Sequence, residues 1–100
     1  MITVNAIHIG NHIALGIVVK LPKTTLIAVT TDNGYIMCGA LDIGLLNERL
    51  KDREIIAARA VGVRTIEELL EAPMESVTHE AAKRGIVPGM KGRDAVTLMF

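Results

Sequence analysis

The only cysteine of the chain, Cys38, is the residue whose type could do chemistry by itself. It lies in the stretch YIMCGALD, residues 35–42, between a short apolar run and residues with helical spacing. N–H groups at the start of a helix could hold its thiol as a thiolate, which would make it a nucleophile. A nucleophile of this kind needs a base, and no motif places one of the three histidines, which are His8, His12 and His79, beside it.

The packing interpretation of Cys38 competes with this chemistry and is favoured. Asp42 lies near the same expected helix start, where its carboxylate would oppose a thiolate. No second cysteine completes a CxxC pair, and free cysteine is among the residue types most often buried. We therefore expect Cys38 to be a core residue, with a thiol-dependent enzyme as the alternative.

Two arginines suggest anion binding. Arg59 lies within the apolar run IIAARAV, where a charged group must find a partner or reach water. An ion pair would satisfy it, and so would an anionic ligand, to which Arg64 could contribute. The candidate ligand-binding residues are thus Cys38, Gly39, Asp42, Arg59 and Arg64.

Metal and cofactor chemistry is not expected. His8 and His12 flank a predicted turn, but two imidazoles without a third ligand at recognisable spacing make an incomplete zinc site. The sequence predicts no metal and no cofactor.

Composition limits the class of protein. One hundred residues fit a single domain, residues 1–100, and the eleven basic and eleven acidic residues cancel. With two aromatic residues and no basic excess, nucleic acid is not an expected partner. The uncharged first nineteen residues contain polar side chains and alternate, so neither a signal peptide nor a membrane span is expected. A cytoplasmic location is the default.

The N-terminal third is predicted to be β-structure that joins subunits. The mean hydropathy of +0.40 implies more apolar surface than a monomer of this size easily buries. Residues 13–21 place large apolar side chains at every second position, and the small residues Ala14 and Gly16 between them suit a packed helix or a neighbouring subunit. We therefore expect a homo-oligomer.

The order of elements predicts a mixed α/β (α+β) fold. Two strands meet at Gly10-Asn11, and a third is followed by Asp32-Asn33-Gly34, which predicts a tight hairpin with positive φ at Asn33 and Gly34. A fourth strand, residues 35–38, should complete an antiparallel β-meander. A helix beginning near Gly39 would then cross over to a fifth, parallel strand in IIAARAV.

Three short helices should complete the chain. The first has Thr65 and Glu68 in capping-box spacing, the second has Ser76 as its cap and Gly85 as its stop, and the third is terminal.

The segments KLPKT, GYIMCGALD, LLNERLKDR, RAVGVRTIEELLEAP, ESVT and GMKGRDA resemble, in this order, the YunC-like family of bacterial and archaeal domains without an assigned function. The resemblance implies a small α/β domain whose N-terminal β region, residues 1–38, joins subunits into a tetramer, with residues 39–100 as the α/β part. It implies no catalytic residues.

These observations predict a cytosolic homo-oligomeric module that binds a small anionic ligand, with the turn at residues 38–42 and Arg59 near the site. A thiol enzyme with Cys38 as nucleophile is one alternative. A purely structural or protein-interaction subunit is the other.

Overall fold

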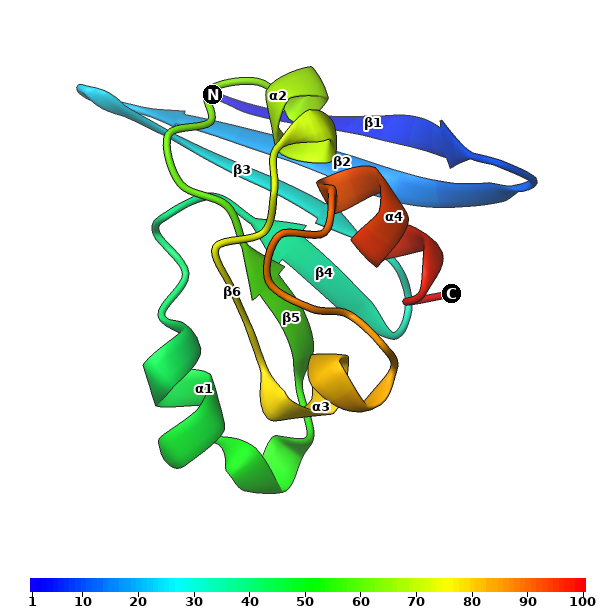
Figure 1. Cartoon of the computed structure of the whole chain (residues 1–100). Coiled ribbons are helices and arrows are strands. Elements are labelled where there is room, and N and C mark those ends of the chain that lie inside the picture. The colour runs from blue at the N-terminus through cyan, green and yellow to red at the C-terminus, as the bar shows by residue number, and fades with distance from the viewer.

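The computed structural model describes residues 1–100, apart from the side chain of Lys51. Its strands form one six-stranded sheet in chain order, from β1 to β6, with short helices packed on it (Figure 1). The elements are β1 (Ile2–Ile9), β2 (His12–Leu21), β3 (Thr24–Thr30), β4 (Gly34–Met37), α1 (Ile43–Glu48), the 3₁₀ helix η1 (Lys51–Arg53), β5 (Ile56–Arg59), α2 (Ile66–Glu71), β6 (Ser76–Val77), α3 (His79–Lys83) and α4 (Gly92–Thr97). The predicted mixed α/β class is confirmed.

The first four strands form the predicted antiparallel meander. β1 and β2 pair from Ile2↔Val19 to Ile9↔His12, and Gly10 in the turn between them has a φ of +60°. β5 then lies parallel to β4, with Ile36 beside Ala58, so the predicted crossover through a helix is also confirmed.

The crossover helix α1 begins later than predicted. Asp42 is its N-cap, because its carboxylate accepts a hydrogen bond from the N–H of Leu45 at 3.0 Å. The predicted start near Gly39 was wrong, since the chain first makes a turn in which the N–H of Leu41 donates to the carbonyl of Cys38 at 3.1 Å.

The turn between β3 and β4 differs from the predicted one in its backbone. Neither Asn33 nor Gly34 has a positive φ. Instead the hydroxyl of Thr31 accepts hydrogen bonds from the N–H groups of both residues, each at 3.1 Å. Gly34 is required for space, because a Cβ there would lie 2.6 Å from the carbonyl oxygen of Ile56.

The predicted cap of the third α-helix was also wrong. Ser76 belongs to strand β6, and Thr78 caps α3 by accepting from the N–H of Ala81 at 3.2 Å. Thr78 also pairs with β5, since its hydroxyl accepts from the N–H of Ala57 at 3.1 Å. The predicted stop at Gly85 agrees with its φ of +89°.

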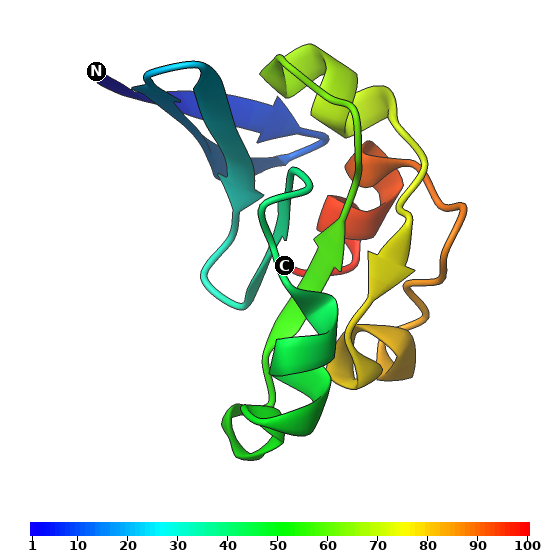
Figure 2. The same cartoon turned by 90° about the vertical axis from the view of Figure 1, so that its left-hand side faces the viewer.

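The main core lies between one face of the sheet and helices α2 and α4. Figure 2 shows both helices on the same side of the N-terminal strands. Gly16 lies beneath α2, where a Cβ would be 2.9 Å from Cγ1 of Ile7 in β1 and 3.4 Å from Cδ1 of Ile66 in α2. A packed helix or a neighbouring subunit was predicted to cover this face, and in the structure it is a helix.

The opposite face of the sheet is only partly covered. Helix α1 packs there against β5, where Ile43, Leu46 and Ala57 form a second buried cluster. Over β1 to β3, no helix of the described chain lies on this face (Figure 2). Its exposed apolar side chains are those of Ile2, Val4, Ile13, Leu15 and Leu21.

No helix in the described chain combines the length and the apolar character needed to span a membrane.

Candidate functional site

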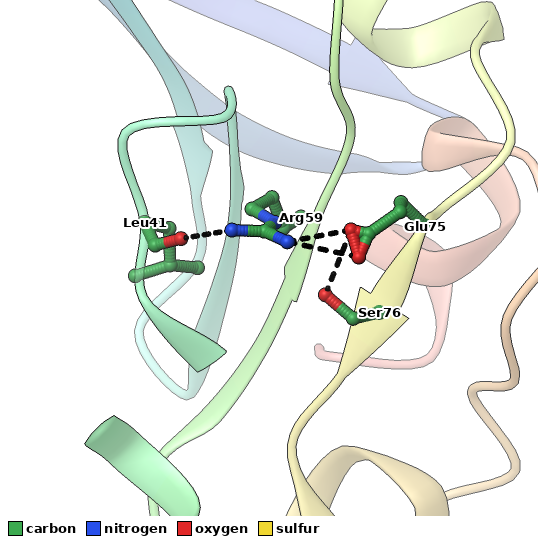
Figure 3. Close-up of polar contacts among 4 residues, drawn as sticks. All are labelled: Leu41, Arg59, Glu75 and Ser76. Carbon is green, nitrogen blue, oxygen red and sulfur yellow. Dashed lines mark hydrogen bonds and ion pairs between the residues drawn. The ribbon is translucent and has the colours of Figure 1, made fainter. Parts of the chain in front are cut away.

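Arg59, the last residue of β5, lies between the crossover turn that contains Leu41 and the chain that enters β6 (Figure 3). One guanidinium nitrogen donates to the carbonyl of Leu41 at 3.0 Å, and the other donates to the two carboxylate oxygens of Glu75 at 2.9 and 2.6 Å. The hydroxyl of Ser76 lies 3.5 Å from the same carboxylate. Arg59 therefore connects three segments that are distant in the sequence.

The charge of Arg59 is paired within the chain. Its hydrogen bond to Glu75, followed by that from Ser76, lowers the pKa of the Glu75 carboxyl below its ordinary value of 4.5. The side chains of Arg59 and Glu75 are 28% and 38% exposed, so water weakens the attraction between them. The ion pair expected as one role of Arg59 is thus present, and an anion bound here would compete with Glu75.

Cys38 follows directly after β4 and belongs to the main core, with 6% of its surface exposed. Its N–H donates to the carbonyl of Ile27 at 3.0 Å, so the backbone continues along the sheet. Because α1 begins only at Ile43, Cys38 does not lie in its first turn. The helical N–H groups that would stabilise a thiolate are therefore not next to it in the chain.

The structure brings some of the predicted site residues together and separates others. Arg59 reaches the turn that contains Gly39 through the carbonyl of Leu41. The carboxylate of Asp42 is used as the cap of α1. Arg64 lies elsewhere, in the segment that leads into α2.

Two of the candidate bases, His79 and His12, have surroundings that do not include the cysteine. His79 lines a hollow of about 240 Å³ together with Leu46, Asn47, Ile55, Glu80 and Lys83. Cys38 is not among these residues. The ring of His12 stacks on Phe100, with their centroids 4.5 Å apart. The described residues contain no group of three or more His, Cys, Asp or Glu side chains placed to share a metal ion.

A second hollow, of about 590 Å³, contains Arg64 and was not predicted from the sequence. Its lining residues come from the β2–β3 hairpin and from the segment before α2, and they are Lys20, Leu21, Lys23, Thr24, Thr25, Val63 and Arg64. We call it the basic hollow. The segment KLPKT, residues 20–24, contains the two lysines of this hollow, but only the fold places that segment beside Arg64.

Comparisons with known proteins agree with the fold. The uncharacterized protein YunC of Bacillus subtilis (strain 168) is 56% identical over 100 residues, which are 100% of this chain and 99% of that protein. The crystal structure of a protein of unknown function, TA1206 from Thermoplasma acidophilum, superposes with a TM-score of 0.89 at 29% identity, covering 100% of this chain and 94% of the other. The family model named DUF1805, a domain of unknown function, matches residues 37–99. The chain therefore belongs to the DUF1805 family, and its resemblance to YunC is confirmed.

Proposed function

We propose that this protein is a cytoplasmic module that self-associates through the open face of β1 to β3 and binds a small anionic ligand. The observation that carries the proposal is the apolar character of that face. Val4, Ile13 and Leu15 have 56%, 60% and 47% of their surfaces exposed. Monomeric proteins rarely expose a continuous apolar patch of this kind unless another surface covers it.

A second copy of the chain is the occupant that we propose for the open face. The residues in register across the first four strands, Val4, Ile17, Ala28 and Met37, give this face a continuous apolar row. The N-terminal region of residues 1–38 would thus be the assembly region, and a tetramer is the state that the family resemblance implies. Since the opposite face is already covered by α2, the same strands can join the fold on one side and a neighbour on the other.

The ligand part of the proposal is supported by the distribution of charge. Of the two arginines considered as anchors, Arg59 is paired with Glu75. Arg64 forms no ion pair within the described chain and lines the basic hollow. A cation without a carboxylate partner, placed at a concave surface, favours binding of an anion from solution.

Light scattering on the full chain at micromolar concentration tests the assembly. We expect a mass of two or more times the 10.8 kDa of one chain. Ile13→Glu should lower this mass, because it places a charge in the apolar contact. Val87→Glu is the matched control, since Val87 is 49% exposed and lies outside the open face. A wild-type mass of one chain, or equal effects of both variants, would contradict self-association through this face.

A further inference from the structure

We propose that the basic hollow binds the phosphate group of a small phosphorylated molecule. This inference rests on the proposed function in one respect: it gives the anionic ligand a place and a chemical class. Neither the turn at residues 38–42 nor Arg59 takes part in it.

Three cationic side chains line the hollow, and no carboxylate does. They are those of Lys20, Lys23 and Arg64. None of the three forms an ion pair with another described side chain. Glu68 of α2 lies next to Arg64, since its carboxylate accepts from the backbone N–H of Arg64 at 2.7 Å, but no acidic side chain lines the hollow itself. The three lining cations therefore have no ion-pair partner among the described side chains.

Hydroxyl groups add uncharged donors to the same surface. Thr24 and Thr25 line the hollow, and each carries a hydroxyl that can donate a hydrogen bond. Thr25 lies beside Lys20 in the β2–β3 register, so the cation and the hydroxyl come from neighbouring strands. Such donors suit the several acceptor oxygens of a phosphate group.

The backbone holds these groups in place from both sides. Arg64 directly precedes Thr65, the N-cap of α2, whose hydroxyl accepts from the N–H of Glu68 at 3.1 Å. On the other side, the two-residue turn Pro22-Lys23 closes the hairpin between β2 and β3. The cations are thus presented by a hairpin and a helix cap rather than by a long loop.

The backbone of Lys23 is a separate indication that its side chain is used. Its φ is +62°, and it follows a proline at the tip of the hairpin. A proline followed by a residue with positive φ is the arrangement of a type II turn, where glycine or asparagine is favoured. The turn thus requires the positive φ, and a lysine adopts it at a cost in free energy that glycine would avoid.

The charge and size of the hollow favour a phosphorylated small molecule. A phosphate monoester carries a charge of about −1.5 to −2 and three acceptor oxygens, whereas a single carboxylate carries one charge and two oxygens. The hollow is open to solvent, and its volume of about 590 Å³ leaves room for a phosphate group and part of the molecule that carries it. Nucleic acid is disfavoured, because α2 beside the hollow carries the exposed acids Glu67 and Glu71 and the net charge of the chain is zero.

Calorimetric titration of the full chain with pyrophosphate, together with amide chemical-shift mapping by NMR, tests the inference. Pyrophosphate should shift the amides of residues 20, 21, 23–25 and 63–64 first, Pro22 having no amide N–H. Lys20→Gln and Arg64→Gln should each weaken its binding about tenfold, because each removes a charge-assisted hydrogen bond. Lys91→Gln is the matched control, since Lys91 is exposed and lies outside the hollow.

Lys23→Asn separates charge from folding. Asparagine tolerates positive φ better than lysine, so this variant should unfold at a temperature no lower than the wild type. It should still bind pyrophosphate more weakly, by about the same tenfold factor.

Three results would overturn the inference. The first is binding that Lys91→Gln weakens as much as Lys20→Gln does, which would indicate general charge attraction. The second is citrate binding at residues 20–25 as tightly as pyrophosphate, which would make the site one for carboxylates. The third is shifts confined to residues 38–42 and Arg59, which would reject the basic hollow but leave the proposed anionic ligand in place. Failure of self-association is read separately, from the mass in light scattering, and is therefore distinguishable from these three results.

Discussion

Arg59 and Glu75 are bonded to each other through both their backbones and their side chains. The N–H of Glu75 donates to the carbonyl of Arg59 at 2.7 Å, and a guanidinium nitrogen of Arg59 donates to both carboxylate oxygens of Glu75. β6 pairs with β5 only at Ala58↔Val77 and Arg59↔Ser76. The backbone and side-chain contacts between Arg59 and Glu75 therefore strengthen the attachment of the short edge strand β6 to β5.

Glu75→Gln should lower the free energy of unfolding in a pH-dependent manner. Because the pKa of Glu75 lies below 4.5 in the folded chain, its carboxylate stabilises the fold above the unfolded-state pKa. This contribution is lost as the pH falls through the folded-state pKa. Urea unfolding across a pH series should therefore show the difference between wild type and variant at neutral pH, and should show it shrinking below pH 4.5.

Glu48→Gln is the control for this experiment, because Glu48 is exposed and forms no ion pair with a described side chain. Its effect should stay small at every pH. A Glu75→Gln difference that does not change with pH would show that the carboxylate charge contributes nothing.

Thr78→Val should destabilise the fold by about 2 kcal/mol or more, because two N–H donors lose their acceptor. Thr78 is only 2% exposed, and its hydroxyl accepts from Ala57 in β5 and from Ala81 in α3. Thr78→Ser keeps the oxygen and removes one methyl group, which should cost about 1 kcal/mol. Chemical denaturation of both variants measures the difference. Equal losses would mean that the methyl group, rather than the hydroxyl, matters at this position.

Gly34→Ala should destabilise the fold by about 1 to 3 kcal/mol through overpacking. Its Cβ would lie 2.6 Å from a backbone oxygen of Ile56, in the neighbouring parallel strand. At Gly44 in α1 the nearest atom to an added Cβ is Oδ1 of Asp42, at 3.4 Å. Gly44→Ala should therefore be neutral or should stabilise by up to about 1 kcal/mol. Thermal unfolding of both variants would contradict this account if their melting temperatures shifted equally.

Cys38 should react slowly with a thiol reagent in the folded protein, because it is buried in the main core. Denaturant should restore the reactivity of an ordinary cysteine. Cys38→Ala should cost about 1 to 2 kcal/mol through lost sulfur contacts. Labelling that is faster in the native protein than in the unfolded chain would instead favour the thiol-enzyme alternative, and His79 would be the first base to test.

The alternation over residues 13–21 was sufficient to predict a strand, but not which of its faces the helices cover. Both faces are apolar, so the choice depended on Ile66 fitting above Gly16, a contact between distant parts of the chain. Similarly, Ser76 and Thr78 are both good caps by residue type. Pairing of β6 with β5 decided between them, and the local sequence does not reveal that pairing.

The candidate site was less predictable than the fold for the same physical reason. Ion-pair partners and concave surfaces are set by tertiary neighbours. Glu75 could not be assigned to Arg59 from spacing alone. Lys20 and Arg64 line one hollow only because the fold brings the β2–β3 hairpin and the segment before α2 together. The turn at Asp32-Asn33-Gly34 likewise differs from the expected one, because the hydroxyl of Thr31 accepts from the N–H groups of Asn33 and Gly34.

The parallel pairing of β4 with β5 divides the chain into two parts that should form at different speeds. The strands β1 to β4 join through short turns, whereas β5 can pair only after the chain has closed around α1 and η1. Closing the longer connection costs more chain entropy, so the meander should gain structure first. Until α2 packs against the meander, both apolar faces of β1 to β3 are exposed to water. During synthesis the emerging N-terminal half is therefore the part of this protein most exposed to aggregation.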